Sequence, residues 1–370
     1  MLGFLTLLLL IFIVAFYGTY YFFGVIMGRS TKIDICGESN YTPTISHITA
    51  TYNEDKIIEE KLNNILNLNY PKDKLELIFV DCSNDNTLKI LKKFKIGNPD
   101  LNIKILHETK RKGLPYALNL GYDNAEGELV VKSDCDILLY EDSLLYLVGC
   151  FNDDRVGGVT GVGVTDIYFE RSYRQIQTRL RIAESNLHST YLFDTFCCFR
   201  KSLLGPIDEQ SLADDAEMAL CIIKKGYKSL INPKARFYER CTASFSERRK
   251  QRDRRAEGHI RLLLKNLDFL FNPKFGYFGI IIFPSNFLMM VFFPWSVLII
   301  YIFSFIMLLQ LNISYSIIYI CSSTLFLYSM YKIPIMGRVG SFIDCQISLI
   351  IAQLRILMRK KSFIWDKIDR

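Results

Sequence analysis

The sequence lacks the patterns that mark the most common metal and cofactor sites. None of its ten cysteines lies in a Cys-x-x-Cys pair, and its four histidines are far apart in the chain, which disfavours a structural zinc site. There is no P-loop, and the glycine-rich stretch at residues 157–163 does not fit the Gly-x-Gly-x-x-Gly turn of dinucleotide-binding proteins. The sequence therefore excludes the two most familiar phosphate-binding loops.

Charged residues are also absent from two long runs, residues 1–28 and 275–331. All 45 basic and 38 acidic residues lie elsewhere, although half of the whole chain is hydrophobic. The net charge of +7 is too small for a dedicated nucleic-acid binder but suits contact with anionic membrane lipids. A helix that crosses a membrane needs about 20 apolar residues. We therefore expect a soluble domain held between two membrane-embedded ends.

The first uncharged run predicts an uncleaved transmembrane helix at residues 1–28. It is longer than the apolar core of a signal peptide, and no basic residue precedes it. Arg29 and Lys32 follow it. Because basic residues next to a span stay on the cytoplasmic side, these two charges place the following domain in the cytoplasm.

The second uncharged run, residues 275–331, is too long for a single span and predicts two transmembrane helices. A break is expected at residues 310–312. Pro284 and Pro294 should kink the first helix, because proline has no backbone N–H to donate. Lys332 marks the return to the cytoplasmic side.

Two further segments are predicted to lie along the membrane surface. Residues 258–274 contain an amphipathic stretch, and residues 332–370 contain a short apolar stretch, 339–354, that precedes a cytoplasmic tail. The short stretch carries Asp344 and is followed by a basic cluster, which spanning would carry across the membrane. We therefore expect an interfacial or re-entrant helix there.

Between these ends, residues 29–257 show short runs of β-branched residues that alternate with helical patterns. This alternation predicts an α/β domain with a mostly parallel central sheet. The glycine-rich stretch at 157–164 is expected to be a tight turn that enters a strand. The expected strands are residues 45–50, 75–80, 103–106 and 129–132, and the expected helices are residues 55–68, 87–94 and 115–124.

Polar and acidic residues follow three of these strands, at the position where parallel sheets bind ligands. They occupy residues 51–54 and 81–85, and Asp134 and Asp136 bracket a single cysteine. Helix capping explains single members such as Asn53, but not two carboxylates so close together. Mg²⁺ and Mn²⁺ bind one or two carboxylates together with phosphate oxygens. The pattern therefore predicts a metal site that holds a nucleoside diphosphate.

Six short segments stand in a recognisable order along the chain. They are TYNE at 51–54, VDCSND at 80–85, GLPYALNLG at 113–121, SDCD at 133–136, LADDAE at 212–217 and QRDRRAEG at 251–258. The ordered set resembles the membrane-embedded branch of glycosyltransferase family 2, which includes cellulose, chitin, hyaluronan and poly-N-acetylglucosamine synthases and ceramide glucosyltransferase. The resemblance implies a GT-A type nucleotide-sugar-binding domain with transmembrane helices at both ends.

The resemblance also implies how the donor, expected to be a UDP-sugar, is held. SDCD resembles the metal-binding DxD motif, with Asp134 and Asp136 as ligands of Mg²⁺ or Mn²⁺. The usual lysine of the third segment is Leu114 here, so Arg111 and Lys112 would take its phosphate role. QRDRRAEG is similar to QxxRW, which closes over the donor diphosphate, but the tryptophan is Arg255. The implied donor contacts are Thr51, Tyr52, Glu54, Asp81, Lys112, Asp134, Gln251, Arg252 and Arg254.

LADDAE resembles the family's TED element, which implies the catalytic residues. Asp215 would be the general base at the start of a helix that runs to Lys225, and Asp214 would have a positioning role. Helix capping by one of these aspartates is the alternative. Because backbone N–H groups and the macrodipole favour anions at a helix start, we expect Asp215 to be ionised at pH 7.

The implied reaction is a single displacement with inversion. The acceptor hydroxyl loses its proton to Asp215 and attacks the anomeric carbon from the face opposite the diphosphate, so an α-linked donor gives a β-glycoside. The acceptor is a lipid or a growing glycan. The modest membrane part and the absent tryptophan favour a lipid, and a processive polysaccharide synthase of the hyaluronan or cellulose type is the alternative.

We expect an integral membrane protein, of the cell membrane or of an internal membrane in a eukaryote, whose active site faces the cytoplasm. The sequence leaves a homo-oligomer open. An alternative from another class is a catalytically silent membrane scaffold that binds sugars. This alternative is disfavoured because a silent relative would have lost some of the implied site residues, and the chain retains Asp81, Asp134, Asp136, Asp215 and Gln251.

Overall fold

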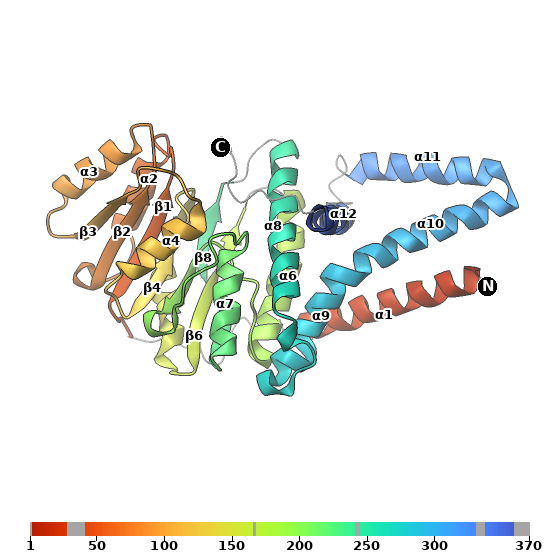
Figure 1. The fold of residues 1–370 in the computed structure, drawn as a ribbon, viewed down its shortest axis with the longest axis horizontal. Coiled ribbons are helices and arrows are strands. Elements are labelled where there is room, and N and C mark those ends of the chain that lie inside the picture. The colour runs from red at the N-terminus through yellow and green to blue at the C-terminus, as the bar shows by residue number, and fades with distance from the viewer. Residues whose placement is uncertain (1, 28–40, 166–167, 241–244, 331–336, 359–370) are drawn as a thin grey trace. The chain divides into compact units, whose positions relative to one another are not determined.

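A computed structural model describes residues 2–27, 41–165, 168–240, 245–330 and 337–358 of the chain (Figure 1). The chain forms two compact units. The second unit is built on a mixed β-sheet, and the first unit is helical. The first comprises Met1–Arg29, Asp166–Ala183 and Phe245–Lys360, and the second comprises Ser30–Thr165, Glu184–Ser244 and Lys361–Arg370.

The sheet of the second unit has eight strands in the order β3-β2-β1-β4-β7-β6-β8-β5. β1 is parallel to β2 and β4, β2 is parallel to β3, and β6 is parallel to β8. The other pairings are antiparallel and involve β7 or β5. The sheet is therefore mostly parallel, as the sequence predicts. The strands are β1 (Ile45–Thr51), β2 (Leu75–Asp81), β3 (Asn102–His107), β4 (Leu129–Lys132), β5 (Ile137–Leu139), β6 (Val156–Val164), β7 (Cys197–Arg200) and β8 (Lys228–Glu239).

Helices connect the parallel strands, and their positions confirm the pattern expected from the sequence. Each expected strand and helix boundary lies within three residues of the observed one. Strand residues such as Ile48, Ile78 and Val130 are fully buried, because a parallel sheet is covered on both faces. The helices of this unit are α2 (Ile58–Leu66), α3 (Thr87–Gly97), α4 (Leu114–Asp123), α5 (Ser143–Gly149) and α7 (Asp214–Lys224).

The glycine-rich stretch is an exception, because it is strand throughout and the expected turn is wrong. It forms most of β6, which pairs with β7 and β8. A Cβ on Gly161 would lie 2.4 Å from the carbonyl oxygen of Ala235, and a Cβ on Gly157 would lie 2.7 Å from Cγ2 of Ile222. Glycine is needed here because neighbouring atoms approach the strand closely, not because the chain turns.

In the first unit, α10 and α11 run in opposite directions and are joined at Asn312 (Figure 1). Asn312 has extended backbone (φ −166°, ψ 137°), so the break falls where the sequence predicts it. α6 begins in this unit and ends in the other. The helices are α1 (Leu2–Met27), α6 (Tyr168–Leu187), α8 (Phe245–Lys265), α9 (Phe283–Phe287), α10 (Phe293–Leu311), α11 (Ile313–Met330) and α12 (Gly337–Leu357).

Two prolines interrupt the regular helix before α11, as expected. Pro284 lies in the first turn of α9 and Pro294 in the first turn of α10. A π-helical turn precedes each, at Phe278–Ile282 and Leu288–Phe292. Because proline cannot donate a hydrogen bond and its ring crowds the carbonyl four residues earlier, the wider turns relieve the contact.

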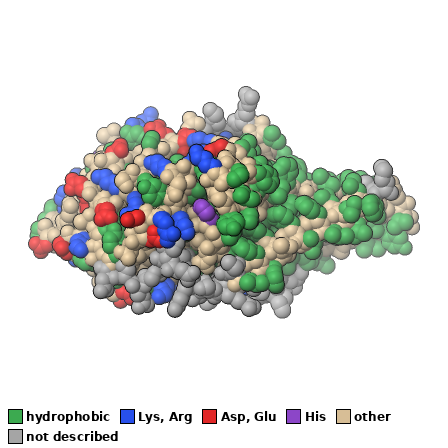
Figure 2. Space-filling model, turned by 90° about the horizontal axis from the view of Figure 1, so that it is seen from below, with side chains coloured by type: hydrophobic (Ala, Val, Ile, Leu, Met, Phe, Trp, Pro, Cys, Tyr) green, Lys and Arg blue, Asp and Glu red, His purple; other side chains and the backbone are tan. Residues whose placement is uncertain are grey.

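Large hydrophobic side chains remain exposed along α1, α10 and α11, whereas acidic and basic side chains gather over the sheet (Figure 2). The segment Ile313–Ser329 of α11 is apolar but short. Length and composition therefore suit the spans expected at residues 1–28 and in the first part of 275–331. Three helical segments are long and apolar enough to cross a membrane: Gly3–Gly24, Phe278–Leu311 and Val339–Leu357.

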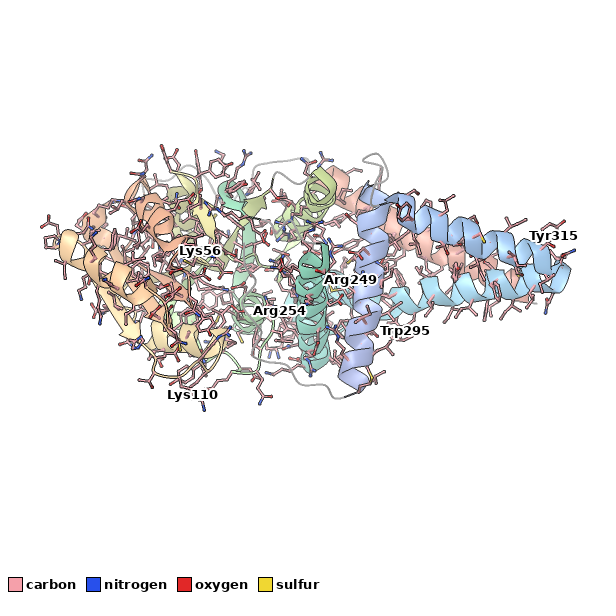
Figure 3. The ribbon with its side chains drawn as sticks, turned by 90° about the horizontal axis from the view of Figure 1, so that it is seen from above. Lys56, Lys110, Arg249, Arg254, Trp295 and Tyr315 are labelled. Atoms are coloured by element: carbon pink, nitrogen blue, oxygen red, sulfur yellow. The ribbon has the colours of Figure 1, made fainter. Side chains whose placement is uncertain are left out.

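α12 packs against α8 and runs across the direction of α1, α10 and α11 (Figures 1 and 3). Ala256 and Ile260 of α8 form a buried apolar cluster with Leu349 and Ala352 of α12. Of the amphipathic segment expected at 258–274, only residues 258–265 belong to α8, and Ile260 among them packs against α12. The rest of that segment forms short 3-10 turns.

Charged residues reinforce this contact. The carboxylate of Asp344 on α12 is buried and accepts hydrogen bonds from Arg249 and Arg252 on α8. Arg249 also donates to Asp253 (3.0 Å), and Arg355 lies 3.6 Å from the same aspartate. A buried carboxylate is costly unless it is paired. The two guanidinium groups therefore hold α12 against α8.

Candidate active site

The parallel strands β1, β2 and β4 bring together the polar residues that the sequence singles out. Thr51 ends β1 and lies directly opposite Asp81, the last residue of β2. β4 ends at Lys132, and the N–H of Ser133 still donates to the carbonyl of Ile48 in β1 (3.1 Å). The carboxyl ends of all three strands thus form one edge, which is where α/β sheets bind ligands.

Asp81 is fully buried and orders this edge. Its Oδ1 accepts hydrogen bonds from the hydroxyl groups of Thr51 (2.8 Å) and Ser83 (2.6 Å). Its Oδ2 lies 3.4 Å from Nδ1 of His107. The observed contacts of Asp81 are therefore with neighbouring side chains of the same unit. Its contact with a uracil or ribose stays a prediction.

The loops after β1 and β2 are tied to each other. The N–H of Asn53 donates to Oγ of Ser83, and Oδ1 of Asn53 accepts from the N–H of Asn84, both at 2.8 Å. The N–H of Glu54 donates to Oγ1 of Thr87 at 2.8 Å. Asn53 has a positive φ of 56°, which persists only where surrounding contacts hold it. The fold itself therefore sets the shape of this loop pair.

Aromatic rings hold two basic residues that follow β3. The guanidinium of Arg111 lies over the ring of Tyr52, 4.0 Å from its centroid, and Nζ of Lys112 lies 3.9 Å from the centroid of Tyr116. Such cation–π contacts orient a basic side chain without neutralising it. Tyr52 thus orients Arg111 and Tyr116 orients Lys112, and the phosphate role of these two basic residues stays a prediction.

A buried lysine joins the turn after β4 to the start of α7. Nζ of Lys132 donates to Oδ2 of Asp214 (2.6 Å) and Oδ1 of Asp215 (2.5 Å), and lies 3.8 Å from Oδ1 of Asp134. Three carboxylates that the sequence assigns to metal binding and catalysis thus share one ammonium. Sequence reasoning missed Lys132. The available signal was a lysine that directly continues the fully apolar strand segment 129–131.

Asp214 and Asp215 are the first two residues of α7, which ends at Lys224, one residue before the expected end. The N-cap residue is Ala213, so neither aspartate occupies the capping position. Both carboxylates bond to Lys132 instead. The capping alternative is therefore wrong for this pair.

Burial changes the ionisation of the pair. Burial, together with the neighbouring Asp214, raises the pKa of Asp215 well above its usual value. Burial alone would also raise the pKa of Asp214, but the ammonium of Lys132 holds that pKa below its usual value. Asp215 is therefore the member that binds a proton more tightly. Burial therefore opposes the effect of the helix start on Asp215, and its ionisation at pH 7 stays a prediction.

Asp134 and Asp136 suit a divalent cation that also binds a diphosphate. Both side chains are half-buried and flank the buried Cys135. Within the described ranges, no group of three or more His, Cys, Asp or Glu residues could hold a metal. Mg²⁺ and Mn²⁺ need only one or two carboxylates when phosphate oxygens and water complete the coordination. These two aspartates are the residues that would hold such an ion.

The remaining predicted site residues, Gln251, Arg252 and Arg254, lie on α8 in the first unit. Arg252 is paired with Asp344 of α12. Figure 3 shows Arg249 on the side of α8 that faces α12, and Arg254, five residues on, lies about 140° further around the helix. Because it pairs with Asp344, Arg252 helps to hold α12. Donor contacts of Gln251, Arg252 and Arg254 stay predictions.

Two family models match the chain. The model for glycosyl transferase family 2 matches residues 46–206, and the model for glycosyl transferase family group 2 matches residues 129–330, which is more than half of the chain. Together they include both the turn that carries Asp134 and Asp136 and the start of α7.

Curated proteins show the same relationship. A probable glycosyltransferase of Bacillus subtilis, YdaM, is 28% identical over 248 residues, covering 63% of this chain and 59% of that protein. The poly-β-1,6-N-acetyl-D-glucosamine synthase of Staphylococcus aureus is 26% identical over 236 residues, covering 60% of this chain and 56% of that protein. The chain thus spans less than two thirds of the length of these relatives.

Among solved structures, the mannosyltransferase PcManGT of Pyrobaculum calidifontis, in complex with GDP-Man and Mn²⁺, is similar over nearly the whole chain. The TM-score is 0.81 with 26% sequence identity, and the match covers 98% of this chain and 100% of that one. The chain therefore belongs to glycosyltransferase family 2 and has the GT-A fold.

Proposed function

We propose that this protein is a membrane-bound, metal-dependent glycosyltransferase that moves a hexose from a nucleoside diphosphate sugar to a hydroxyl group. The observation that carries the proposal is the shared contact of Lys132 with Asp134 and Asp215. Inversion needs a charge-stabilising group on the leaving-group side of the sugar and a base on the other. Lys132 links a residue proposed for each role.

Asp215 is proposed as the general base. It accepts the proton of the acceptor hydroxyl as that oxygen attacks the anomeric carbon. The raised pKa favours this transfer, because a general base is most effective when its pKa lies near the pH at which the enzyme works. Lys132 stabilises the ionised carboxylate before reaction. Inversion then converts an α-linked donor into a β-glycoside, and no covalent sugar intermediate is required.

Asp134 and Asp136 are proposed to hold Mg²⁺ or Mn²⁺, which would supply positive charge to the departing diphosphate. Lys112 is proposed to bind phosphate oxygens. Gln251 and Arg254 of α8 are proposed as further diphosphate contacts.

Two donors are supported by different observations. A UDP-sugar is implied by the sequence motifs. GDP-mannose is a second candidate, because a structure that matches 98% of this chain is a mannosyltransferase in complex with GDP-Man and Mn²⁺. Asp81 suits both, because a carboxylate accepts hydrogen bonds from the ring N–H groups of uracil and guanine.

The acceptor is proposed to be a lipid or a growing glycan at the cytoplasmic face of a membrane. Three apolar helical segments support membrane attachment. The poly-β-1,6-N-acetyl-D-glucosamine synthases among the relatives support the alternative of a processive synthase. The pairing of Asp344 with α8 favours α12 at the membrane surface, because spanning would draw the basic face of α8 toward the bilayer.

The direct test offers radiolabelled GDP-mannose, UDP-glucose and UDP-N-acetylglucosamine, each with Mn²⁺, to native membranes that contain the protein. Label should enter a lipid-soluble or a polymeric fraction from one donor, and EDTA should prevent this. Asp136→Asn should abolish transfer, whereas Asp123→Asn, at an exposed site on α4, should not. Full activity of Asp136→Asn in EDTA would contradict the metal site. No transfer from any donor would favour the silent scaffold.

Orientation is tested separately. Cysteines introduced at the exposed residues Glu141 and Asn312 test positions that the proposal places on opposite sides of the membrane. A membrane-impermeant thiol reagent added to intact cells should label Asn312→Cys, and Glu141→Cys only after the cytoplasmic face is opened. The reverse pattern would overturn the proposed orientation.

A further inference from the structure

The turn that carries Asp134 and Asp136 is held by a lysine to which the proposed reaction gives no role. Lys61 lies on α2 and is fully buried. Its Nζ donates to Oγ of Ser133, just before the turn, and to the carbonyl oxygen of Ile137, just after it, both at 2.9 Å. One ammonium therefore joins the two ends of the metal-binding turn.

Neighbouring side chains extend this link in both directions. Oγ of Ser133 lies 2.6 Å from Nε2 of His47, a fully buried residue of β1. One helical turn after Lys61, the side chain of Asn64 bonds β5 twice: Nδ2 donates to the carbonyl of Leu139 and Oδ1 accepts from its N–H, both at 2.8 Å. The start of the turn is thus anchored to β1 and its end to α2.

We propose that Lys61 is a positioning residue for the metal site. It acts through Ser133 and Ile137 to keep the carboxylates of Asp134 and Asp136 at the separation that one divalent cation needs. This inference rests on the proposed metal site.

The choice of lysine supports this role. Burying an ammonium is unfavourable, and an apolar side chain of similar volume is often at least as stable in such a place. An apolar side chain cannot bond a hydroxyl and a carbonyl at the same time. Lys61 does so across the segment that contains both metal-binding aspartates. Residues that orient metal ligands in this way commonly affect metal affinity as well as reaction rate.

The test compares Mn²⁺ binding to the purified full-length chain, followed by electron paramagnetic resonance with GDP or UDP present. Lys61→Met removes the ammonium but keeps an unbranched side chain. Lys72→Met is the matched control, because Nζ of Lys72 also donates to two backbone carbonyls, those of Ile65 (3.4 Å) and Leu68 (3.1 Å). We expect the Kd for Mn²⁺ to rise about 10- to 100-fold in Lys61→Met and to stay within about twofold in Lys72→Met.

A second variant keeps the inference testable if Lys61→Met does not fold. Ser133→Ala removes only the hydroxyl that accepts from Lys61, and it should also weaken Mn²⁺ binding. In the double variant the two losses should not add, because both act through one link. Nucleotide binding in EDTA should be unchanged in each variant, which separates loss of the metal site from general damage.

The outcomes distinguish this inference from the proposed function. Unchanged Mn²⁺ affinity in folded Lys61→Met, or in Ser133→Ala if the lysine variant does not fold, overturns the role of Lys61. Failure of the wild-type chain to bind Mn²⁺ with either nucleotide contradicts the metal site itself. Asp136→Asn, which should lose the signal, confirms that the measured ion occupies this site.

Discussion

Nζ of Lys132 lies 2.5 Å from Oδ1 of Asp215, so the strand that leads into the turn with Asp134 and Asp136 also fixes the first turn of α7. The same ammonium is 2.6 Å from Asp214 and 3.8 Å from Asp134. Because one buried ammonium makes all three contacts, movement of the proposed base is coupled to movement of the proposed metal ligand.

Replacing Lys132 with methionine should destabilise the second unit and abolish transfer. Removing one partner of a buried ion pair commonly costs about 3–5 kcal/mol, because the remaining charges are left uncompensated. The free energy of unfolding in urea measures this loss. Arg155→Met is the control, since Arg155 forms an exposed pair with Asp153 and loss of an exposed pair should change stability little. If both variants lose an equally small part of the free energy of unfolding, Lys132 does not balance the charge of the carboxylates.

Asp215→Asn should separate catalysis from donor binding. The amide keeps the size of the carboxylate but cannot accept the acceptor proton, and a general base commonly contributes about 10² to 10⁴ in rate. We expect at least about a hundredfold loss in transfer with near-normal binding of the nucleoside diphosphate. Asp214→Asn should lose less. If initial rates show the opposite ranking, the roles of the two aspartates must be exchanged.

His47 should make the fold sensitive to acid. Burial, reinforced by the nearby charge of Lys61, lowers the pKa of His47 from 6.5 to about 3. Between these values the unfolded chain binds a proton at this residue and the folded chain does not. Stability is therefore lost as the pH falls from about 6.5 toward 3.

His47→Gln removes the titrating ring and keeps a polar group near Ser133. In the affected range, wild type should lose up to about 1.4 kcal/mol more per pH unit than the variant, because one pKa unit corresponds to that free energy. Urea unfolding at pH 7 and pH 5 gives the comparison. Parallel losses in the two proteins would contradict a neutral buried histidine.

Local pattern is sufficient to predict the parallel half of the sheet. Apolar runs such as Leu77–Val80 end at polar residues, and burial on both faces allows little else in such strands. The stretch at 157–163 is misread because glycine marks both turns and close approaches. A close approach is distinguished from a turn only by atoms of other helices and strands, here Ala235 of β8 and Ile222 of α7.

The buried lysines could not be predicted for a related reason. A lysine in a helix or at a strand end is usually solvated. Lys61 and Lys132 are buried because their partners, including Ser133 and Asp214, come from segments more than seventy positions away in the chain. The ionisation of Asp215 follows the same rule, since its burial and its ammonium partner are tertiary features. The types of residue at the site are therefore predictable, whereas their electrostatic coupling is not.

Asp344→Asn should loosen α12 from α8. The buried carboxylate of Asp344 accepts from Arg249 and Arg252, and hydrogen bonds to charged groups contribute about 1.5–3 kcal/mol each. An amide keeps the shape but removes the negative charge that Arg249 and Arg252 share. Cys345 reports the result, because it packs against the apolar cluster between the two helices.

Maleimide labelling of Cys345, followed peptide by peptide with mass spectrometry, should be at least about tenfold faster in Asp344→Asn than in wild type, as expected for a loss above about 1.4 kcal/mol. Asp268→Asn, at an exposed position in the same unit, controls for the loss of one negative charge and should leave the rate unchanged. If Asp344→Asn also leaves the rate unchanged, Ala256, Ile260, Leu349 and Ala352 hold the helices together without the ion pairs. Faster labelling would instead show that the two arginines hold α12 in place.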